Sequence, residues 1–263
     1  EKDRKGEYPK ITYMGEIIAV VAGNSEEQVD EALKKVKVTY DAGTPQMNDR
    51  DPSNASGRDQ EKESGDVAAG FAEADTVVEG YYGLPMITHC CLESHGQVVE
   101  YKDGKLNIWP STQNVSGCAN TLTRALKDCN STADMMNVDT QYMGGGFGSK
   151  FVADRWDQIG AELSIQTGRP VKMMLERDME IKSAGHRPSA YGNMKIGVKK
   201  DGTVTALEAT AWGSGGQQRF RMPPMPYVFT GIPNWKSTGK SIPTNRGLVR
   251  AWRGPNHPQA ALL

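Results

Sequence analysis

Residues 141–150 read Gln-Tyr-Met-Gly-Gly-Gly-Phe-Gly-Ser-Lys and join a β-like run, residues 136–143, to an amphipathic helical pattern over residues 152–167. Three consecutive glycines, with a fourth after one aromatic residue, let the backbone turn sharply and face its N–H groups outward. The helix that follows adds unpaired N–H donors and the positive end of its dipole. The stretch therefore predicts a loop that holds an oxyanion, a phosphate or a metal-bound oxo group. The alternative is a tight turn that only allows close helix–strand packing.

Hairpins and helices alternate on both sides of this loop. Hairpins are predicted where Asp-Gly separates two alternating runs, at residues 97–109 and 193–212. Helices are predicted over residues 68–72, 116–127 and 152–167, and single strands over residues 76–84 and 171–175. Gly168 and Pro170 follow the third helix in the order expected at a helix end. Hairpins mixed with helices favour an α+β fold over a doubly wound parallel sheet.

The first 65 residues differ in composition from the rest. Residues 16–22 are apolar and predict a buried strand, Asn24 or Ser25 caps a short helix, and residues 36–40 alternate as a second strand. The next stretch has hardly any apolar side chain and predicts a solvated linker. We therefore expect three parts, at residues 1–42, 43–65 and 66–263.

Composition excludes several classes of protein. Lys and Arg number 31 against 32 Asp and Glu, which removes the general argument for nucleic acid or an anionic membrane as partner. No apolar run approaches the ~20 residues of a membrane span. The four cysteines form no C-x-x-C pair, and the four histidines show no metal-ligand spacing on one helix, so neither a zinc site nor an iron–sulfur cluster is predicted. We expect a soluble protein of a reduced compartment, the cytoplasm.

Two further segments place polar side chains at the ends of elements, beside Pro or Gly. Residues 109–114 read Trp-Pro-Ser-Thr-Gln-Asn and lie between a strand and a helix. Residues 250–259 read Arg-Ala-Trp-Arg-Gly-Pro-Asn-His-Pro-Gln. Functional residues are concentrated on such connections, so both segments are candidates for the same site as the glycine loop.

Taken in order, these motifs resemble the molybdenum-binding subunit of the xanthine oxidase/aldehyde oxidase family. The matching patterns are S-T-Q at residues 111–113, G-G-G-F-G-x-K at 144–150, R-P-V-[KR]-x-x-L-x-R at 169–177 and A-x-R-G-x-x-x-P-Q at 251–259. Residues 88–95 resemble the family's H-x-x-[ML]-E-P stretch, although Ser94 replaces its Pro. Residues 15–41 resemble the end of its α/β-hammerhead domain, so residues 66–263 are expected to form the first molybdopterin-binding domain.

The resemblance implies a molybdopterin cofactor whose molybdenum is held through the pterin rather than by protein ligands. Enzymes of this family hydroxylate a carbon of an aldehyde or an aromatic N-heterocycle with oxygen derived from water. Two electrons then leave through iron–sulfur clusters to a flavin or another acceptor. Because this chain lacks cluster motifs, the resemblance implies iron–sulfur and FAD partner subunits or domains, and an oligomer.

The resemblance also assigns the cofactor-binding residues. Gln113 would donate a hydrogen bond from its amide to the apical oxo group of molybdenum; the alternative is that Gln113 caps the helix after it. Gly145 and Gly146 would form the loop around the cofactor. Phe147 and Gly148 would offer main-chain N–H groups, and the Phe147 ring would wall the substrate channel.

Arg253 is the catalytic candidate that this resemblance implies. It would lie near the metal and steady negative charge on a substrate carbonyl or ring nitrogen; the alternative is a structural arginine that binds loop carbonyls. Phe151 stands where xanthine-oxidising members carry a glutamate, which favours a substrate less polar than xanthine. Residues 222–226 either line a substrate funnel or pack as a loop. Four matching residues are interpreted as framework: Glu93, Arg169, Arg177 and Asp178.

Two other classes of function were weighed. The family's catalytic glutamate belongs to a glycine-rich stretch that this sequence does not contain, and both ends of the chain read as cut. The sequence is therefore interpreted as part of a longer hydroxylase subunit, with a non-catalytic module that has lost its cofactor as the alternative. A nucleotide-binding dehydrogenase fails on pattern, because residues 144–148 match neither G-x-G-x-x-G nor a P-loop.

Overall fold

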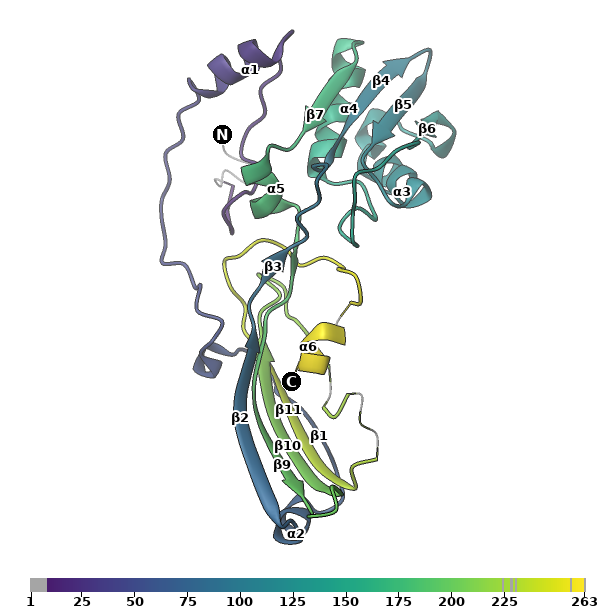
Figure 1. Cartoon of the computed structure of the whole chain (residues 1–263). Coiled ribbons are helices and arrows are strands. Elements are labelled where there is room, and N and C mark those ends of the chain that lie inside the picture. Colours follow the sequence, from purple (N-terminus) through teal and green to yellow (C-terminus); the bar gives the residue numbers. More distant parts are fainter. Residues whose placement is uncertain (1–8, 224, 228, 230, 256, 263) are drawn as a thin grey trace.

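Three β-sheets organise the part of the chain that the computed structural model describes, residues 9–223, 225–227, 229, 231–255 and 257–262 (Figure 1). A curved five-stranded sheet lies at one end and a four-stranded sheet with two helices at the other. A two-stranded ribbon, β3 (Ile87–Thr88) with β8 (His186–Arg187), lies between them. This mixture of sheets and helices confirms the predicted α+β class.

The five-stranded sheet has the order β1-β11-β10-β9-β2. Its strands span Gln60–Ser64, Asn234–Ser241, Val204–Gly213, Ala190–Val198 and Thr76–Leu84. Neighbours are antiparallel except β10 and β11, which are parallel. β9 and β10 form the predicted hairpin. Apolar side chains of this sheet, of Met225, Tyr227 and Ile232 and of α6 (His257–Leu262) form a buried cluster, and α2 (Val67–Ala72) contacts β10 and β11.

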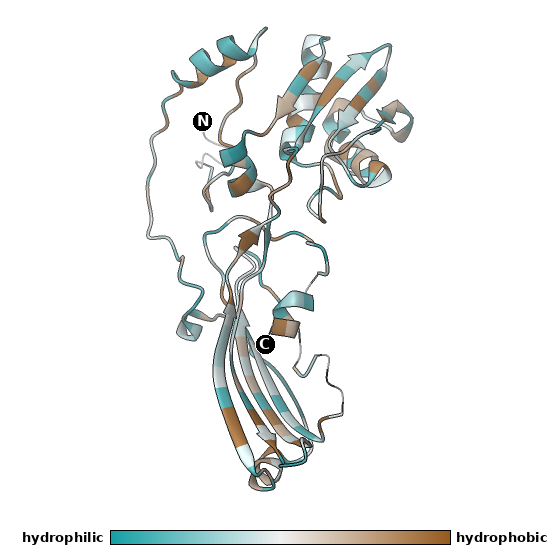
Figure 2. Cartoon of the chain, in the orientation of Figure 1, coloured by the Kyte–Doolittle hydropathy of each residue, from teal (hydrophilic) through white to brown (hydrophobic). Residues whose placement is uncertain are grey.

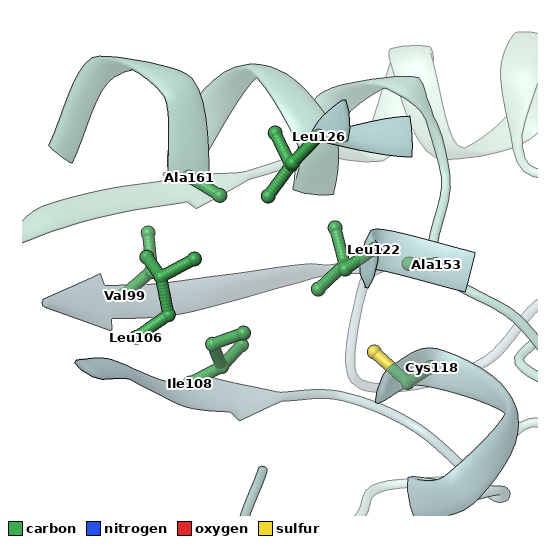
Figure 3. Close-up of a cluster of buried hydrophobic side chains, with 8 residues drawn as sticks. All are labelled: Val99, Leu106, Ile108, Cys118, Leu122, Leu126, Ala153 and Ala161. Carbon is green, nitrogen blue, oxygen red and sulfur yellow. The ribbon is translucent and has the colours of Figure 1, made fainter. Parts of the chain in front are cut away.

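The four-stranded sheet has the order β6-β5-β4-β7 and is covered by α3 and α4 (Figure 1). The strands span Met136–Val138, Lys105–Pro110, Gly96–Lys102 and Val171–Met174, and the helices span Val115–Ala125 and Arg155–Thr167. β4 and β5 form the other predicted hairpin, with Asp103 and Gly104 both at positive φ. Figure 3 shows the core between sheet and helices, built from eight residues: Val99, Leu106, Ile108, Cys118, Leu122, Leu126, Ala153 and Ala161.

The predicted strands near the N-terminus are wrong. Residues 16–22 and 36–40 pair with no strand among the described residues, and Ile18, Val38 and Tyr40 are exposed. A strand forms only where a neighbour accepts its hydrogen bonds, and apolar composition alone supplies no neighbour. The helix between the two runs is confirmed as α1 (Glu26–Leu33), which Ser25 caps and which Figure 2 shows as mainly hydrophilic.

The stretch predicted as a solvated linker, residues 43–65, is structured in part. A 3-10 turn spans Pro52–Asn54, and β1 pairs with β11 at the edge of the larger sheet. The side chains of β1 are largely exposed, so its polar sequence gave no strand signal, while its backbone still completes the ladder. The division into residues 1–42, 43–65 and 66–263 stays a prediction.

The remaining elements are short. α5 spans Arg177–Ser183, and 3-10 turns span Lys127–Cys129 and Ala133–Met135. Among the described residues, no helix has the length and apolar character needed to cross a membrane.

Helix α4 begins later than the sequence predicted. Ser149 to Asp154 separate the glycine loop from its first residue, Arg155, so the helix N-terminus does not continue directly from the loop. Asp157 accepts a hydrogen bond from the backbone N–H of Asp154 at 2.8 Å and closes this end of the helix. Burial raises the pKa of Asp157 to about 7, although the bond from Asp154 opposes the rise.

Replacing Asp157 by Asn should change how stability depends on pH. The pKa of Asp157 in the folded chain lies above its ordinary value of 3.8, so the folded state binds the extra proton and loses stability as pH rises towards 7. Asn keeps an acceptor for Asp154 and carries no charge. We expect the advantage of Asp157→Asn in free energy of unfolding to grow by about 1.4 kcal/mol per pH unit between about pH 4 and 7.

Urea denaturation at pH 4.5, 6.0 and 7.5 measures this difference. Asp134→Asn, at an exposed carboxylate, is the control and should show no such trend. Parallel pH curves for the wild type and Asp157→Asn would contradict the assignment.

Candidate cofactor site

The parallel pair β5 and β6 brings two of the candidate segments together. Their register places Ile108 opposite Val138, and parallel strands end at the same edge of a sheet. The Ser-Thr-Gln segment leaves this edge after β5, and the glycine loop follows β6. The Thr140 hydroxyl donates to the carbonyl of Pro110 at 2.9 Å and holds the two exits side by side.

Gln113 lies against the glycine loop with its amide oxygen facing it. Gln113 Oε1 accepts hydrogen bonds from the backbone N–H of Gly148 at 2.9 Å and of Lys150 at 3.3 Å. A Cβ atom on Gly146 would lie 2.5 Å from this oxygen, so a larger residue there would push the Gln113 amide away from the loop. Two N–H donors fix the orientation of the amide, which turns its Nε2 group away from the loop. Nε2 has no acceptor among the described residues.

The alternative role for Gln113, as a helix cap, is wrong. Asn114 caps α3, and its Oδ1 accepts the N–H of Gly117 at 3.0 Å. The side chain of Gln113 is therefore free of the helix and bound to the loop.

The loop itself combines bonded and unbonded amides. The N–H of Gly144 donates to Glu93 Oε2 at 2.6 Å, and that of Gly148 donates to Gln113. This second bond differs from the expectation, in which Gly148 offered its N–H to the cofactor. The N–H groups of Gly145, Gly146 and Phe147 have no acceptor among the described residues. Phe147 has φ 51°, and its exposed ring lies on the surface, as does that of Phe151.

The third candidate segment meets the loop through its backbone. The N–H of Arg253 donates to the carbonyl of Phe147 at 2.7 Å, and Arg187 Nη2 donates to the carbonyl of Arg253 at 2.8 Å. The Arg253 side chain is exposed, and no hydrogen bond from its guanidinium is found within the described residues. The alternative role for Arg253, a structural arginine that binds loop carbonyls, therefore fits its neighbours Arg187 and Arg250 instead.

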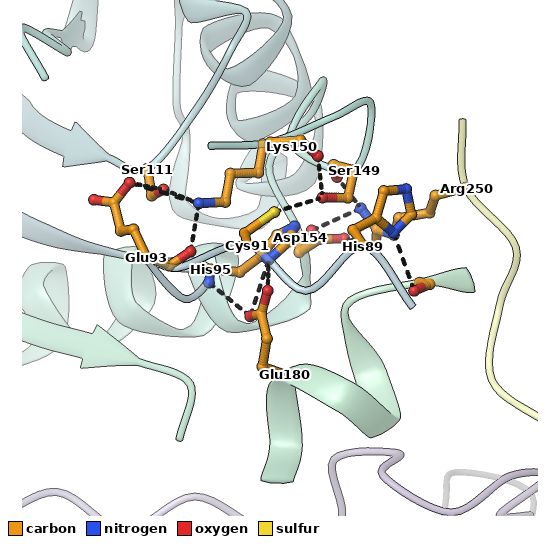
Figure 4. A network of polar contacts seen from close by, with 12 residues as sticks. His89, Cys91, Glu93, His95, Ser111, Ser149, Lys150, Asp154, Glu180 and Arg250 are labelled. Carbon is orange, nitrogen blue, oxygen red and sulfur yellow. Dashed lines mark hydrogen bonds and ion pairs between the residues drawn. The ribbon is translucent and has the colours of Figure 1, made fainter. Parts of the chain in front are cut away.

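Arg250 fastens this segment to the start of α4. Its guanidinium forms an ion pair with both carboxylate oxygens of Asp154 and also donates to the carbonyl of Ser149 at 3.1 Å (Figure 4). His89 Nε2 lies 2.7 Å from the carbonyl of Ala251. Burial lowers the pKa of His89 against the raising effect of its hydrogen bonds to carbonyls, which favours the neutral ring.

Trp252 packs against one aromatic ring and one cation. Its indole stacks on the imidazole of His89 at 4.8 Å, and the guanidinium of Arg187 lies 4.8 Å from its centroid. The sequence assigned no role to His89, Arg187 or Arg250. His89, Arg250 and Trp252 lie inside segments quoted from the sequence, but their partners come from distant parts of the chain.

A cavity of about 290 Å³ adjoins this segment. Phe220, Trp252 and Pro255 supply apolar walls, Arg187, Arg221 and Arg250 supply cations, and no acidic residue lines the cavity among those described. Neither Phe147 nor Phe151 belongs to its lining.

For residues 222–226, the burial of two methionines favours packing of a loop over a substrate funnel. Met222 and Met225 are buried in two apolar clusters on the five-stranded sheet. Pro224 lies outside the described residues.

The unbonded donors of the site suit an oxygen-rich group. No cluster of three or more His, Cys, Asp or Glu that could hold a metal ion is found within the described residues. The donors instead are Gln113 Nε2 and three consecutive N–H groups, which suit oxygen acceptors.

Comparison with known proteins agrees with this geometry. The family model of the molybdopterin cofactor-binding domain matches residues 47–263. Xanthine dehydrogenase/oxidase of Mus musculus is 30% identical over 267 residues, which cover 97% of this chain and 20% of that protein. The aldehyde oxidoreductase molybdenum-binding subunit PaoC of Escherichia coli K12 is 28% identical over 209 residues, covering 78% of this chain and 28% of PaoC.

Solved structures share the fold. Aldehyde oxidoreductase from Desulfovibrio gigas superposes with a TM-score of 0.71 at 26% identity, over 90% of this chain and 28% of that one. Quinoline 2-oxidoreductase from Pseudomonas putida 86 gives a TM-score of 0.71 at 21% identity, over 88% of this chain and 32% of that one, which is a likeness of fold alone. The chain thus spans between a fifth and a third of the proteins it matches, and it belongs to the molybdopterin cofactor-binding domain family, with relatives among xanthine dehydrogenases and aldehyde oxidases.

Proposed function

We propose that this chain supplies one wall of the cofactor site in a molybdenum hydroxylase that oxidises an aldehyde or an aromatic N-heterocycle with oxygen derived from water. One observation carries the proposal. Gln113 binds the glycine loop through its oxygen only, which leaves Nε2 and the N–H groups of residues 145–147 without acceptors among the described residues. These donors belong to two segments that leave the same edge of the four-stranded sheet.

The cofactor would be molybdopterin. Gln113 would donate from Nε2 to an oxygen atom of the cofactor, and the N–H groups of Gly145, Gly146 and Phe147 would hold its other oxygen atoms. When bound, the cofactor supplies a molybdenum centre that accepts two electrons as a substrate carbon gains oxygen. Neutral donors suit this position because they orient oxygen atoms without adding charge next to the metal.

Arg253 would act on the substrate. Its backbone is fixed to Phe147 and Arg187, so the start of the side chain is held while the guanidinium stays exposed. A cation held in this way stabilises negative charge that develops on a carbonyl oxygen or a ring nitrogen.

The substrate and the remaining parts of the enzyme belong to the same proposal. Phe151 stands where xanthine-oxidising members of the family carry a glutamate, so a molecule less polar than xanthine is favoured. Iron–sulfur clusters and FAD would be carried by other subunits or domains of an oligomer in the cytoplasm.

Gln113→Ala tests the cofactor contact in the native protein, purified with all its partner chains. We expect about one molybdenum atom per chain in the wild type and a 10- to 100-fold loss of cofactor affinity or activity in the variant, as found when an outer hydrogen bond to a metal site is removed. Gln141→Ala, at an exposed glutamine of the same loop, is the control. A wild-type protein without molybdenum would support the non-catalytic module instead.

Arg253→Gln tests the substrate contact. The variant should keep its molybdenum content, because Arg253 touches the loop through backbone atoms, while kcat for an aromatic aldehyde falls about 100-fold, the size expected when one stabilising donor is lost. Arg155→Gln, at the exposed start of α4, is the matched control. An unchanged kcat in Arg253→Gln would remove this residue from the catalytic role.

A further inference from the structure

Lys150 is the largest side chain that is fully buried in the described chain, with 1% of its surface exposed. A buried ammonium is costly unless it is paired and hydrogen-bonded. Lys150 Nζ donates to the carbonyl of Glu93 at 2.8 Å and to the hydroxyl of Ser111, and it lies 3.5 Å from the carboxylate of Glu93 (Figure 4). Its partners thus come from two other segments of the site.

The backbone of Lys150 holds the Gln113 segment as well. Its carbonyl accepts the N–H of Gln113 at 3.0 Å and the hydroxyl of Thr112 at 2.9 Å. Its N–H donates to Gln113 Oε1. Side chain and backbone together therefore tie one residue to three consecutive positions, 111, 112 and 113.

Glu93 extends the same connection to the other end of the glycine loop. Its Oε2 accepts the N–H of Gly144 at 2.6 Å and the hydroxyl of Ser111 at 2.7 Å. Burial alone would raise the pKa of Glu93, but these bonds and the Lys150 ammonium hold it below its ordinary value. The carboxylate therefore stays charged, and its bond to Gly144 is a charge-assisted one.

We propose that Lys150 and Glu93 form a positioning pair, which fixes both ends of the glycine loop against Gln113 so that the donors of the site keep one arrangement before the cofactor binds. The inference rests on the proposed function for the identity of that cofactor. Neither side chain of the pair is assigned a contact with cofactor or substrate. Preorganisation of donors lowers the ordering cost of binding, so the pair acts on affinity.

The first test follows the loop in protein produced in a host that makes no molybdopterin. Lys150→Met removes the charge and keeps a long apolar side chain, and Glu93→Gln removes the opposite charge. Hydrogen–deuterium exchange of the peptide covering residues 143–150 should become roughly tenfold faster in each variant, because hydrogen bonds to charged groups are lost. Exchange in α4, residues 156–167, should stay unchanged. Lys182→Met, at a lysine paired with Asp178 on the surface, is the control.

A structural role alone predicts a different pattern. If Lys150 only fills the core, Lys150→Met should speed exchange in α4 and β4 as much as in the loop, and Glu93→Gln should leave the loop unchanged; either result overturns the pair. The variant that combines Lys150→Met and Glu93→Gln adds a second criterion. If the two residues act as one pair, its loop should exchange no faster than that of Lys150→Met alone. Additive effects would also overturn it. Glu93→Gln keeps the test decisive if Lys150→Met does not fold.

Molybdenum content separates this inference from the proposed function. In a host that makes the cofactor, both variants should retain 10- to 100-fold less molybdenum than the wild type at equal cofactor supply. A wild type that holds molybdenum, beside variants with a loose loop and full molybdenum, overturns the positioning role. A wild type without molybdenum overturns the proposed function, while the exchange data still decide whether the pair holds the loop.

Discussion

The parallel pairing of β5 and β6 is the constraint on which the rest of the site depends. Leu106 and Ile108 are fully buried and fix β5 in the core, and Val138 packs against the same cluster from β6. Because the strands run in the same direction, the chain leaves both at one edge, once towards Gln113 and once towards the glycine loop. An antiparallel pair would place these two exits at opposite edges and separate the donors.

The cations of the site are of two kinds: some hold parts of the chain together, and one is left exposed to solvent. Two cations of the site that are shielded from solvent each have a carboxylate, Arg250 with Asp154 and Lys150 with Glu93, while the buried Arg187 is held by carbonyl oxygens and by Gln259. Such pairs resist change, because removing one partner leaves an uncompensated charge in the interior. Arg253, by contrast, is exposed, and no carboxylate pairs with it among the described residues. The cation that is left to meet a ligand is therefore the one whose backbone, rather than side chain, is fixed to the loop.

The sequence predicted what local signals determine. Both Asp-Gly hairpins and the helix end at Gly168 were found because these residues fix backbone conformation by themselves. Two strands near the N-terminus were predicted wrongly and β1 was missed, since pairing depends on a neighbour that composition does not reveal. Gln113 and Arg253 were identified because the motifs that contain them occur in the same order as in the family. The burial of Lys150 was not predicted, because its partners Glu93 and Ser111 are 57 and 39 residues away in the sequence.

The contacts of Gln113 also show why a carboxamide suits the cofactor contact proposed for this position. The N–H groups of Gly148 and Lys150 demand an acceptor, and a ligand rich in oxygen demands a donor on the far side of the same group. A carboxylate satisfies the loop but repels oxygen ligands, and an ammonium has no acceptor to offer the loop. Asn has both functions on a side chain that is one methylene shorter than that of Gln. The loop therefore sets the need for an acceptor, the proposed ligand adds the need for a donor, and a carboxamide combines the two.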